Sequence, residues 1–441
     1  MRCAHPFRFS AASQTAVGLA LAIASSVALH AETAGDGLRA RIEAAQPGAV
    51  IVVAAGVYEG PFVIDKSIRI QGKPGATLEG TGRGHVVDVR AADVELSGFV
   101  IRHSGSNLST DDAGVHLRAP RAWIHHNTIV DTLHGIYVRQ APEARLTNNV
   151  IRGRAAPESI ADPLTNQLKL SSAELCSVTL EQNQRGNGIH IWNCANHLIE
   201  DNDIRGTRDG IYFSFCDETT VRRNVIREVR YGLHYMYSDN NVFEDNLFTD
   251  SAAGSALMYS TGITLQHNRF LANRSHRAYG LLLHSVETTR IERNFIQGNT
   301  VGLFLENCIA NTVVGNTVAG NYIGVRLSDS SDENQFSANS FRENIHAVET
   351  SGVPTSNTWS IAGVGNYWEE ALKLDLDRNG IADVPHYETD LFGRWRRLFP
   401  EIGLLSGSPG ERALRFVHTR IHLPGVPGVK DERPLVRRIL P

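Results

Sequence analysis

The chain has 441 residues, with 43 Lys and Arg against 47 Asp and Glu and a formal net charge of −4 at pH 7. This balance lacks the one-signed field of a nucleic-acid binder or of a protein that binds anionic membranes directly, so both classes are excluded. Glycine is plentiful, with 39 residues, and methionine is scarce, with three. Such a composition is typical of a turn-rich β protein and not of a helical bundle.

Residues 1–31 have the features of a cleavable secretory signal. Arg2 and Arg8 precede an apolar run from Ala16 to Leu29 that contains small residues near its end. The run is too short to span a bilayer, and no later segment reaches the roughly 18 consecutive apolar residues that a spanning helix needs. The sequence therefore predicts an exported chain that reaches a membrane only through partners.

Two short motifs recur along the chain with a common period of about 22 residues. One is an Asn followed two residues later by an apolar residue, and the other is a Gly that begins an alternating apolar strand. From Gly188 to Gly302, each Gly precedes the Asn of its own repeat by 14 residues. The Asn positions are 127, 149, 202, 224, 246, 268, 294, 316 and 339.

This pattern predicts an all-β fold, a right-handed parallel β-helix in which like residues stack from coil to coil. Gly and Asn tolerate left-handed backbone angles, so we expect them to form the turns. The Asn column has a structural explanation as a buried ladder of side-chain amides, and we assign it no chemistry.

The repeat also predicts the domain organisation. Residues 32–104 should form an N-terminal cap with a short helix and irregular first coils, and residues 105–350 the regular coils. Between Asn149 and Asn202 the spacing grows to 53 residues, which predicts an insertion near 153–185. Residues 351–400 should form a C-terminal cap with an acidic loop, and 401–441 a docking tail.

Four soft or borderline metal ligands fall on the outer face of three successive coils. Residues two and four after each strand Gly should point outward, which applies to His234, Met236, Met258 and His284. Because coils lie about 4.8 Å apart, Met236, Met258 and His284 should form one row beside His234. Thioether sulfur with neutral imidazole suits Cu(I), so we predict a copper site here. Alternatively, the methionines merely cover an apolar patch.

Other residues of the same columns have weaker claims. Ala256 and Leu282 should also face outward, and His116 and His190 are expected at the surface because their coils bring no Met. Cys194 and Cys216 lie one period apart, which allows a stacked thiol pair, a strained disulfide or extra metal ligands, and a stack in the core is favoured. Cys308 is expected in the core.

An acidic segment near the C-terminus alternates oxygen-bearing side chains and has Gly380 at its sixth position, as calcium loops of the EF type do. It lacks the Glu that such loops carry at the twelfth position. The segment is therefore either a structural calcium site or a solvated acidic turn. The calcium ligands would be Asp375, Asp377, Asn379, Ile381 and Asp383.

Five longer motifs extend through the mature chain: Gly232-Leu-His-Tyr-Met-Tyr-Ser238, Leu257-Met-Tyr-Ser260, Gly365-Asn-Tyr-Trp368, the segment 375–385, and Asp431-Glu-Arg-Pro-Leu435. Together they resemble the NosD family of nitrous oxide reductase maturation proteins. The resemblance implies a periplasmic accessory protein, not an enzyme, that works with the permease and ATPase of an ABC transporter. It also implies that copper arrives from a lipoprotein chaperone and goes to the copper–sulfur centre of nitrous oxide reductase.

The main alternative is a carbohydrate-active enzyme, a polysaccharide lyase, hydrolase or epimerase, since long β-helices commonly bind sugar chains. Such chemistry needs paired carboxylates, or an acid with a base, on adjacent coils. Asp209, Asp217, Arg222 and Arg223 are near one another in sequence. We nevertheless expect no outward column to stack acids, or an acid with a base.

Overall fold

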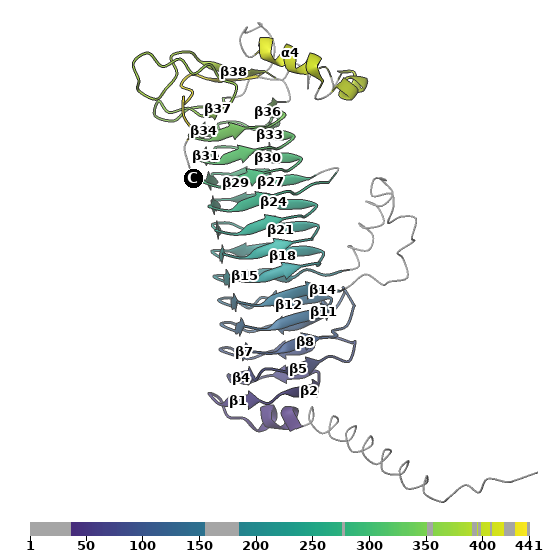
Figure 1. Cartoon of the computed structure of the whole chain (residues 1–441). Coiled ribbons are helices and arrows are strands. Elements are labelled where there is room, and N and C mark those ends of the chain that lie inside the picture. The colour runs from purple at the N-terminus through teal and green to yellow at the C-terminus, as the bar shows by residue number, and fades with distance from the viewer. Residues whose placement is uncertain are drawn as a thin grey trace, which may run out of the picture.

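The computed structural model describes residues 37–154, 185–275, 278–350, 356–389, 395, 398–405, 408–418 and 428–438. In Figure 1 these residues form a long column of stacked coils, with a helix over 37–44 at one end and the C-terminal segments at the other. The predicted signal at 1–31 and nearly all of the insertion at 153–185 lie outside the described residues. Within the described ranges, no helix is both long and apolar enough to cross a membrane.

Three parallel sheets run the length of the column, and each coil contributes one strand to each sheet, which confirms the predicted β-helix. The first sheet has 12 strands: β1 (Val50–Val53), β4 (Arg69–Gly72), β7 (Glu95–Ser97), β10 (Trp123–His125), β13 (Arg145–Thr147), β16 (Leu198–Glu200), β19 (Thr220–Arg222), β22 (Val242–Glu244), β25 (Thr264–Gln266), β28 (Arg290–Glu292), β31 (Thr312–Val314) and β34 (Gln335–Ser337).

The second sheet has 13 strands: β2 (Gly56–Glu59), β5 (Ala76–Glu79), β8 (Val100–Arg102), β11 (Thr128–Thr132), β14 (Val150–Gly153), β17 (Asp203–Arg205), β20 (Val225–Arg227), β23 (Leu247–Thr249), β26 (Arg269–Leu271), β29 (Phe295–Gln297), β32 (Thr317–Ala319), β35 (Ser340–Arg342) and β37 (Tyr367–Trp368).

The third sheet, which carries the predicted metal ligands, has 12 strands: β3 (Phe62–Ile64), β6 (Val87–Val89), β9 (Ala113–Leu117), β12 (His134–Arg139), β15 (Ile189–Ala195), β18 (Asp209–Asp217), β21 (Tyr231–Met236), β24 (Ala253–Thr261), β27 (Tyr279–Glu287), β30 (Val301–Glu306), β33 (Ile323–Leu327) and β36 (His346–Thr350).

The strand glycines are required by close packing and not by backbone angle. Gly210 and Gly232 are not among the residues with positive φ, so their backbone would also suit other residue types. A Cβ on Gly210 would lie 2.5 Å from the carbonyl oxygen of Gly232 and 2.3 Å from Ile226. The left-handed residue is instead the one before each ladder Asn, such as Asp201 or Arg223. The expectation that Gly and Asn form the left-handed turns is therefore wrong for these two columns, but it holds at other turn positions such as Asn148, Gly206 and Gly298.

The predicted Asn ladder is present and buried. In each step the side-chain oxygen of one Asn accepts hydrogen bonds from the backbone and side-chain N–H groups of the Asn one coil before, as Asn246 does from Asn224 at 3.0 Å. Each amide thus satisfies turn backbone that would otherwise be buried without a partner. Two further ladders, which the sequence analysis missed, occupy the other corners: Asn273, Asn299, Asn321 and Asn344, and Asn311, Asn334 and Asn357.

The N-terminal coils are more regular than expected. All three sheets begin at β1, β2 and β3, and β1 already pairs in parallel with β4. The predicted insertion falls between β14 and β15 in the chain, and β15 pairs directly with β12 of the preceding coil. The solenoid therefore continues through the point of insertion without a break in the third sheet.

Asp431 fastens the C-terminal end of the column. The hairpin of β38 (His386–Thr389) and β39 (Gly428–Asp431) lies over the last coils (Figure 1), near the 3-10 helix η2 (Pro400–Leu405) and the helix α4 (Pro409–His418). The fully buried Asp431 carboxylate accepts hydrogen bonds from Asn366 N, Trp368 Nε1 and Arg433 N. Two of the family-like motifs, Gly365–Trp368 and Asp431–Leu435, are thus parts of one closure.

A buried imidazole makes the stability of the column depend on pH. Burial lowers the pKa of His197 to about 4, from an ordinary value of 6.5. Between these values the unfolded chain binds a proton that the folded chain does not, so stability falls as the pH falls through this window. We expect His197→Asn to remove about 3 kcal/mol of this pH-dependent loss in the free energy of unfolding. The measurement compares the free energy of unfolding at pH 7 with that at pH 4.5.

Asn is the natural replacement because Asn241, Asn311 and Asn334 continue the corner column in which His197 lies. His197 Nδ1 accepts a hydrogen bond from Ala144 N at 3.1 Å, a role that an amide oxygen can take over. The exposed His267 provides the control, since His267→Asn should leave the pH dependence as in the wild type. Equal pH dependence of His197→Asn and the wild type would contradict the prediction.

Candidate metal site

The predicted metal ligands lie in register on three adjacent strands of the third sheet. Met236 of β21 stands opposite Met258 of β24, which stands opposite His284 of β27. His234 is two residues before Met236 on the same strand, so it lies in the neighbouring column. All four side chains are partly exposed, including His234 at 16% and His284 at 25%. The structure thus brings the four donors to one open face.

In each of the two histidines, a carboxylate oxygen lies within hydrogen-bond distance of the ring nitrogen Nδ1. His234 Nδ1 lies 3.1 Å from Asp209 Oδ2, and His284 Nδ1 lies 2.9 Å from Glu306 Oε2. An ionised carboxylate only accepts, so Nδ1 donates its hydrogen and Nε2 keeps the lone pair. This is the arrangement by which proteins fix the tautomer of a metal-binding histidine and raise its basicity.

The two carboxylates differ in how firmly they are held. Asp209 is fully buried and accepts two hydrogen bonds from the Arg230 guanidinium, at 2.8 and 2.7 Å. Burial alone would raise the pKa of Asp209, but the hydrogen bonds from His234 and Arg230 outweigh it and hold the pKa at about 2. Asp209 therefore remains an anion over the whole physiological range. The side chain of Glu306 is 43% exposed, so His284 has the looser support.

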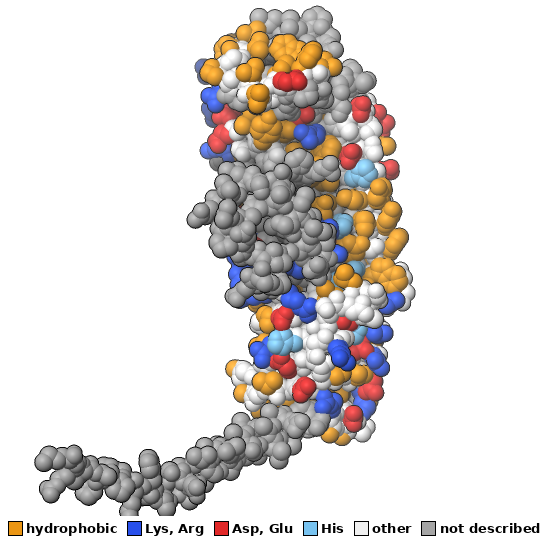
Figure 2. Space-filling view, turned by 90° about the vertical axis from the view of Figure 1, so that its right-hand side faces the viewer, with side chains coloured by type: hydrophobic (Ala, Val, Ile, Leu, Met, Phe, Trp, Pro, Cys, Tyr) orange, Lys and Arg blue, Asp and Glu red, His pale blue; other side chains and the backbone are white. Residues whose placement is uncertain are grey.

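A column of exposed aromatic rings borders the methionines. Phe215, Tyr237 and Tyr259 follow the outward column by one residue and have φ of 54°, 50° and 54°. Left-handed angles are unusual for bulky side chains and here turn the rings outward, where they are 53%, 48% and 44% exposed. Their planes stack at 5.2 and 5.1 Å. Figure 2 shows hydrophobic side chains and histidines together along one edge of the solenoid.

Several residues expected at the surface are covered. Ala256, Leu282 and His116 are buried, and His190 is only partly exposed. The reason is that side chains in one column cover one another. Tyr137 lies between His116, which it meets edge-on, and His190, to which it is tilted, with ring centroids 5.4 and 4.4 Å away.

The covering column was visible in the sequence. Tyr137 and Tyr212 occupy the position of His190 and His234 in their own coils, so histidines and tyrosines alternate there. Burial lowers the pKa of His116 to about 3 and that of His190 well below its ordinary value, which keeps both imidazoles neutral. The pattern continues to His234, whose ring lies 5.0 Å from that of Tyr212.

The cysteines largely follow expectation. Cys194 and Cys216 stand opposite each other on β15 and β18, and both are free thiols, as is Cys308. Cys216 and Cys308 are fully buried, whereas Cys194 is only partly buried where it packs against the core.

The acidic loop forms hydrogen bonds with its own backbone. Asp375 accepts from Asn379 N and Gly380 N, Asp377 accepts from Asn379, and Asp383 accepts from Leu376 N. Ile381 N donates to Asn379 Oδ1. A solvated turn would be held in the same way, so calcium binding here stays a prediction.

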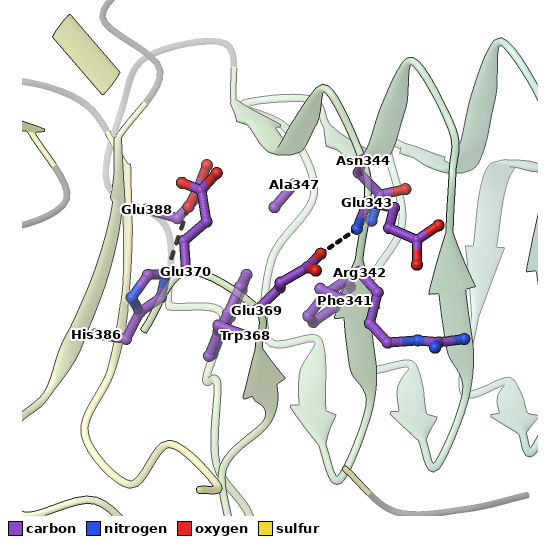
Figure 3. Close-up of a pocket in the computed structure, with 10 residues that line it drawn as sticks. All are labelled: Phe341, Arg342, Glu343, Asn344, Ala347, Trp368, Glu369, Glu370, His386 and Glu388. Carbon is purple, nitrogen blue, oxygen red and sulfur yellow. Dashed lines mark hydrogen bonds and ion pairs between the residues drawn. The ribbon is translucent and has the colours of Figure 1, made fainter. Parts of the chain in front are cut away.

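A cavity of about 80 Å³ lies between the last coil and the β38–β39 hairpin (Figure 3). His386 and Glu388 face it from β38, with Nε2 and Oε2 3.4 Å apart, while Glu369 accepts a hydrogen bond from Glu343 N. In the described part of the chain, no three His, Cys, Asp or Glu side chains come together as a metal site. The cavity thus belongs to the C-terminal closure between the last coil and the β38–β39 hairpin.

The structure corrects one argument against an enzyme. Asp209 and His234, an acid and a base, do meet on adjacent coils, and Asp217 and Asp239 also stack. Asp209 is fully buried and paired with Arg230, which leaves it out of reach of a polymer. The oxygens of Asp217 and Asp239 accept backbone hydrogen bonds from the next coil. Both pairs thus have structural partners.

Comparison with known proteins gives one family and one fold. Residues 169–372 match the family model "Periplasmic copper-binding protein (NosD)". A protein of Stutzerimonas stutzeri is 34% identical over 400 residues, which cover 87% of this chain and 86% of the relative. One of Pseudomonas aeruginosa is 34% identical over 449 residues, 98% of both chains. Each is named "Probable ABC transporter binding protein NosD".

Solved structures share the fold alone. The A-module of a mannuronan C-5 epimerase from Azotobacter vinelandii superposes with a TM-score of 0.55 at 12% identity, over 75% of this chain and 94% of that module. The catalytic unit of an α-1,3-glucanase from Streptomyces thermodiastaticus gives 0.56 at 15% identity, over 76% and 66% of the two chains. These neighbours are enzymes, whereas the two relatives are named as binding proteins.

Proposed function

The chain belongs to the NosD family of periplasmic copper-binding proteins, and from this premise we propose that it carries Cu(I) to nitrous oxide reductase. The proposed site consists of His234, Met236, Met258 and His284. The observation that supports it best is the pair of carboxylates at His234 and His284, because each holds Nδ1 and leaves Nε2 as the nitrogen that can bind an ion.

The donor set fits a transfer site for a soft ion. Two thioethers and two neutral imidazoles favour Cu(I) over Ca(II) or Mg(II), which take oxygen ligands. The face is open and its four donors come from short stretches of three strands. A partner can therefore approach the ion and add its own ligand before the first bonds break.

The aromatic column supports this exchange. Phe215, Tyr237 and Tyr259 form an exposed apolar border next to the methionines, and exposed apolar patches mark protein contacts. The three ring planes stack on one another. We infer that the lipoprotein chaperone and the reductase dock here in turn, each with its copper ligands over the Met row.

A second surface suits the ABC transporter for which the relatives are named. The C-terminal segments expose Leu404, Phe399 and Phe416 at 91%, 57% and 57%, far from the Met row along the column (Figure 1). Apolar side chains at such exposure are costly unless a partner covers them. We infer that this end contacts the transporter permease, with the ATPase beyond it, and that the copper face stays accessible.

Maturation in cells tests this function. A denitrifying host that lacks the chain should make nitrous oxide reductase without its copper–sulfur centre, and the wild-type chain should restore that centre, measured by the visible absorption of the purified reductase. Variants Leu404→Ser and Phe416→Ser should fold and bind Cu(I) yet fail to restore it. Full restoration by a chain without Met236 and Met258 would refute the proposed site.

A further inference from the structure

We propose that Cys194 and Cys216 form a second Cu(I) site, a two-coordinate dithiolate one coil before the Met row. The proposal rests on the proposed function only in the choice of ion. Both residues stand opposite each other on β15 and β18, two strands that precede β21 and β24 in the same sheet. Five consecutive coils thus carry a soft or borderline donor: Cys194, Cys216, Met236, Met258 and His284.

The two sulfur atoms have matching positions. Cys194 Sγ donates to Trp192 O at 3.4 Å, and Cys216 Sγ donates to Ser214 O at 3.2 Å, each to the carbonyl two residues back. Side chains in the same rotamer on paired parallel strands repeat at the strand spacing of about 4.8 Å. The sulfur atoms should therefore lie roughly one strand spacing apart.

That spacing fits a metal better than a bond between the sulfurs. A disulfide requires a sulfur separation of about 2.05 Å, so at least one side chain would have to turn. Two metal–thiolate bonds of about 2.3 Å, placed end to end, span about 4.6 Å. A linear ion between the two sulfurs therefore fits the thiols with little movement of either strand.

The surroundings favour Cu(I) over other thiophilic ions. Structural Zn(II) needs four ligands, but no third His, Asp or Glu joins these thiols in the part of the chain that the structure describes. Cu(I) is satisfied by two thiolates. Binding releases both thiol protons to solvent, forms two Cu–S bonds and leaves copper in its oxidation state.

Access is provided from one side of the pair. Cys216 is fully buried, but Cys194 is partly exposed and offers the ion a first contact. An ion that binds Cys194 first can then take the buried Cys216 as its second ligand.

Serine variants give a clean test because serine already occupies this column. Ser238 Oγ and Ser260 Oγ donate to the carbonyls of Met236 and Met258 at 2.9 Å, as the thiols do in their own coils. Cys194→Ser with Cys216→Ser should therefore fold. Cys308, buried farther along the column beside Val286 and Ser331, provides the matched control Cys308→Ser.

Anaerobic titration of the reduced mature protein with Cu(I), against a colorimetric chelator, should give two ions per wild-type chain and two for Cys308→Ser. The Cys194/Cys216 variant should hold one, and Cu(I) should protect Cys194 of the wild type from alkylation. Undiminished copper content in that variant, or unprotected Cys194, would overturn the proposal. A variant without Met236 and Met258 should retain the dithiolate ion, which separates failure of this site from failure of the proposed function.

Discussion

Replacing Met236 and Met258 together by leucine should lower the affinity for Cu(I) of the proposed site, which also contains His234 and His284, by more than about 100-fold. Loss of a residue that only supports a metal ligand typically costs roughly 10–100-fold, so loss of two direct ligands should cost more. Leucine keeps the volume and apolar character of methionine, and such swaps usually cost less than about 1.5 kcal/mol. Chelator competition under anaerobic conditions measures the affinity, with Cys194 and Cys216 replaced by serine in both proteins.

Glu306→Gln supplies a graded comparison. It removes the charge behind His284 but keeps the shape and one acceptor oxygen, and Glu306 is 43% exposed, so the fold should tolerate it. We expect roughly tenfold weaker binding. The corresponding change at Asp209 is less clean, because it would leave Arg230 without its buried partner. Unchanged affinity for Cu(I) in the methionine variant would rule out the proposed site at Met236 and Met258, whatever affinity Glu306→Gln shows.

Register explains why the donors could be identified from the sequence. A parallel β-helix places like positions of successive repeats opposite one another, so the Met236, Met258 and His284 row follows from counting from each strand Gly. The carboxylate of Glu306 lies in the same column and could have been found by the same count. Asp209 lies one residue before Gly210, outside the columns that were compared.

Burial on the outer face could not be predicted from alternation. Alternation distinguishes the two faces of a strand but does not say what covers each face. His116 is outward and yet buried, because the ring of Tyr137 and the ring of His85 pack on it. The roles of the strand glycines were also mistaken, because the space beside Gly210 depends on the carbonyl of Gly232 in the next coil.

The largest effect on stability should come from Asp431→Ala at the C-terminal closure. The change leaves two buried donors, Asn366 N and Trp368 Nε1, and the partly buried Arg433 N without their acceptor. Each buried donor left unsatisfied costs about 1–3 kcal/mol, so the two buried donors together cost roughly 2–6 kcal/mol. We expect a local loss of that size, with the β38–β39 hairpin released from the last coils.

Hydrogen exchange should show where the loss occurs. A solenoid coil contacts only its neighbours, so opening at one end need not spread through the column. Amides of β37, β38 and β39 should exchange much faster in Asp431→Ala, whereas those of β18, β21 and β24 should keep their wild-type protection. Glu432→Ala, at an exposed neighbouring carboxylate, should change neither group. Equal deprotection of all strands would mean that Asp431 holds the whole column, and copper binding should then fall with it.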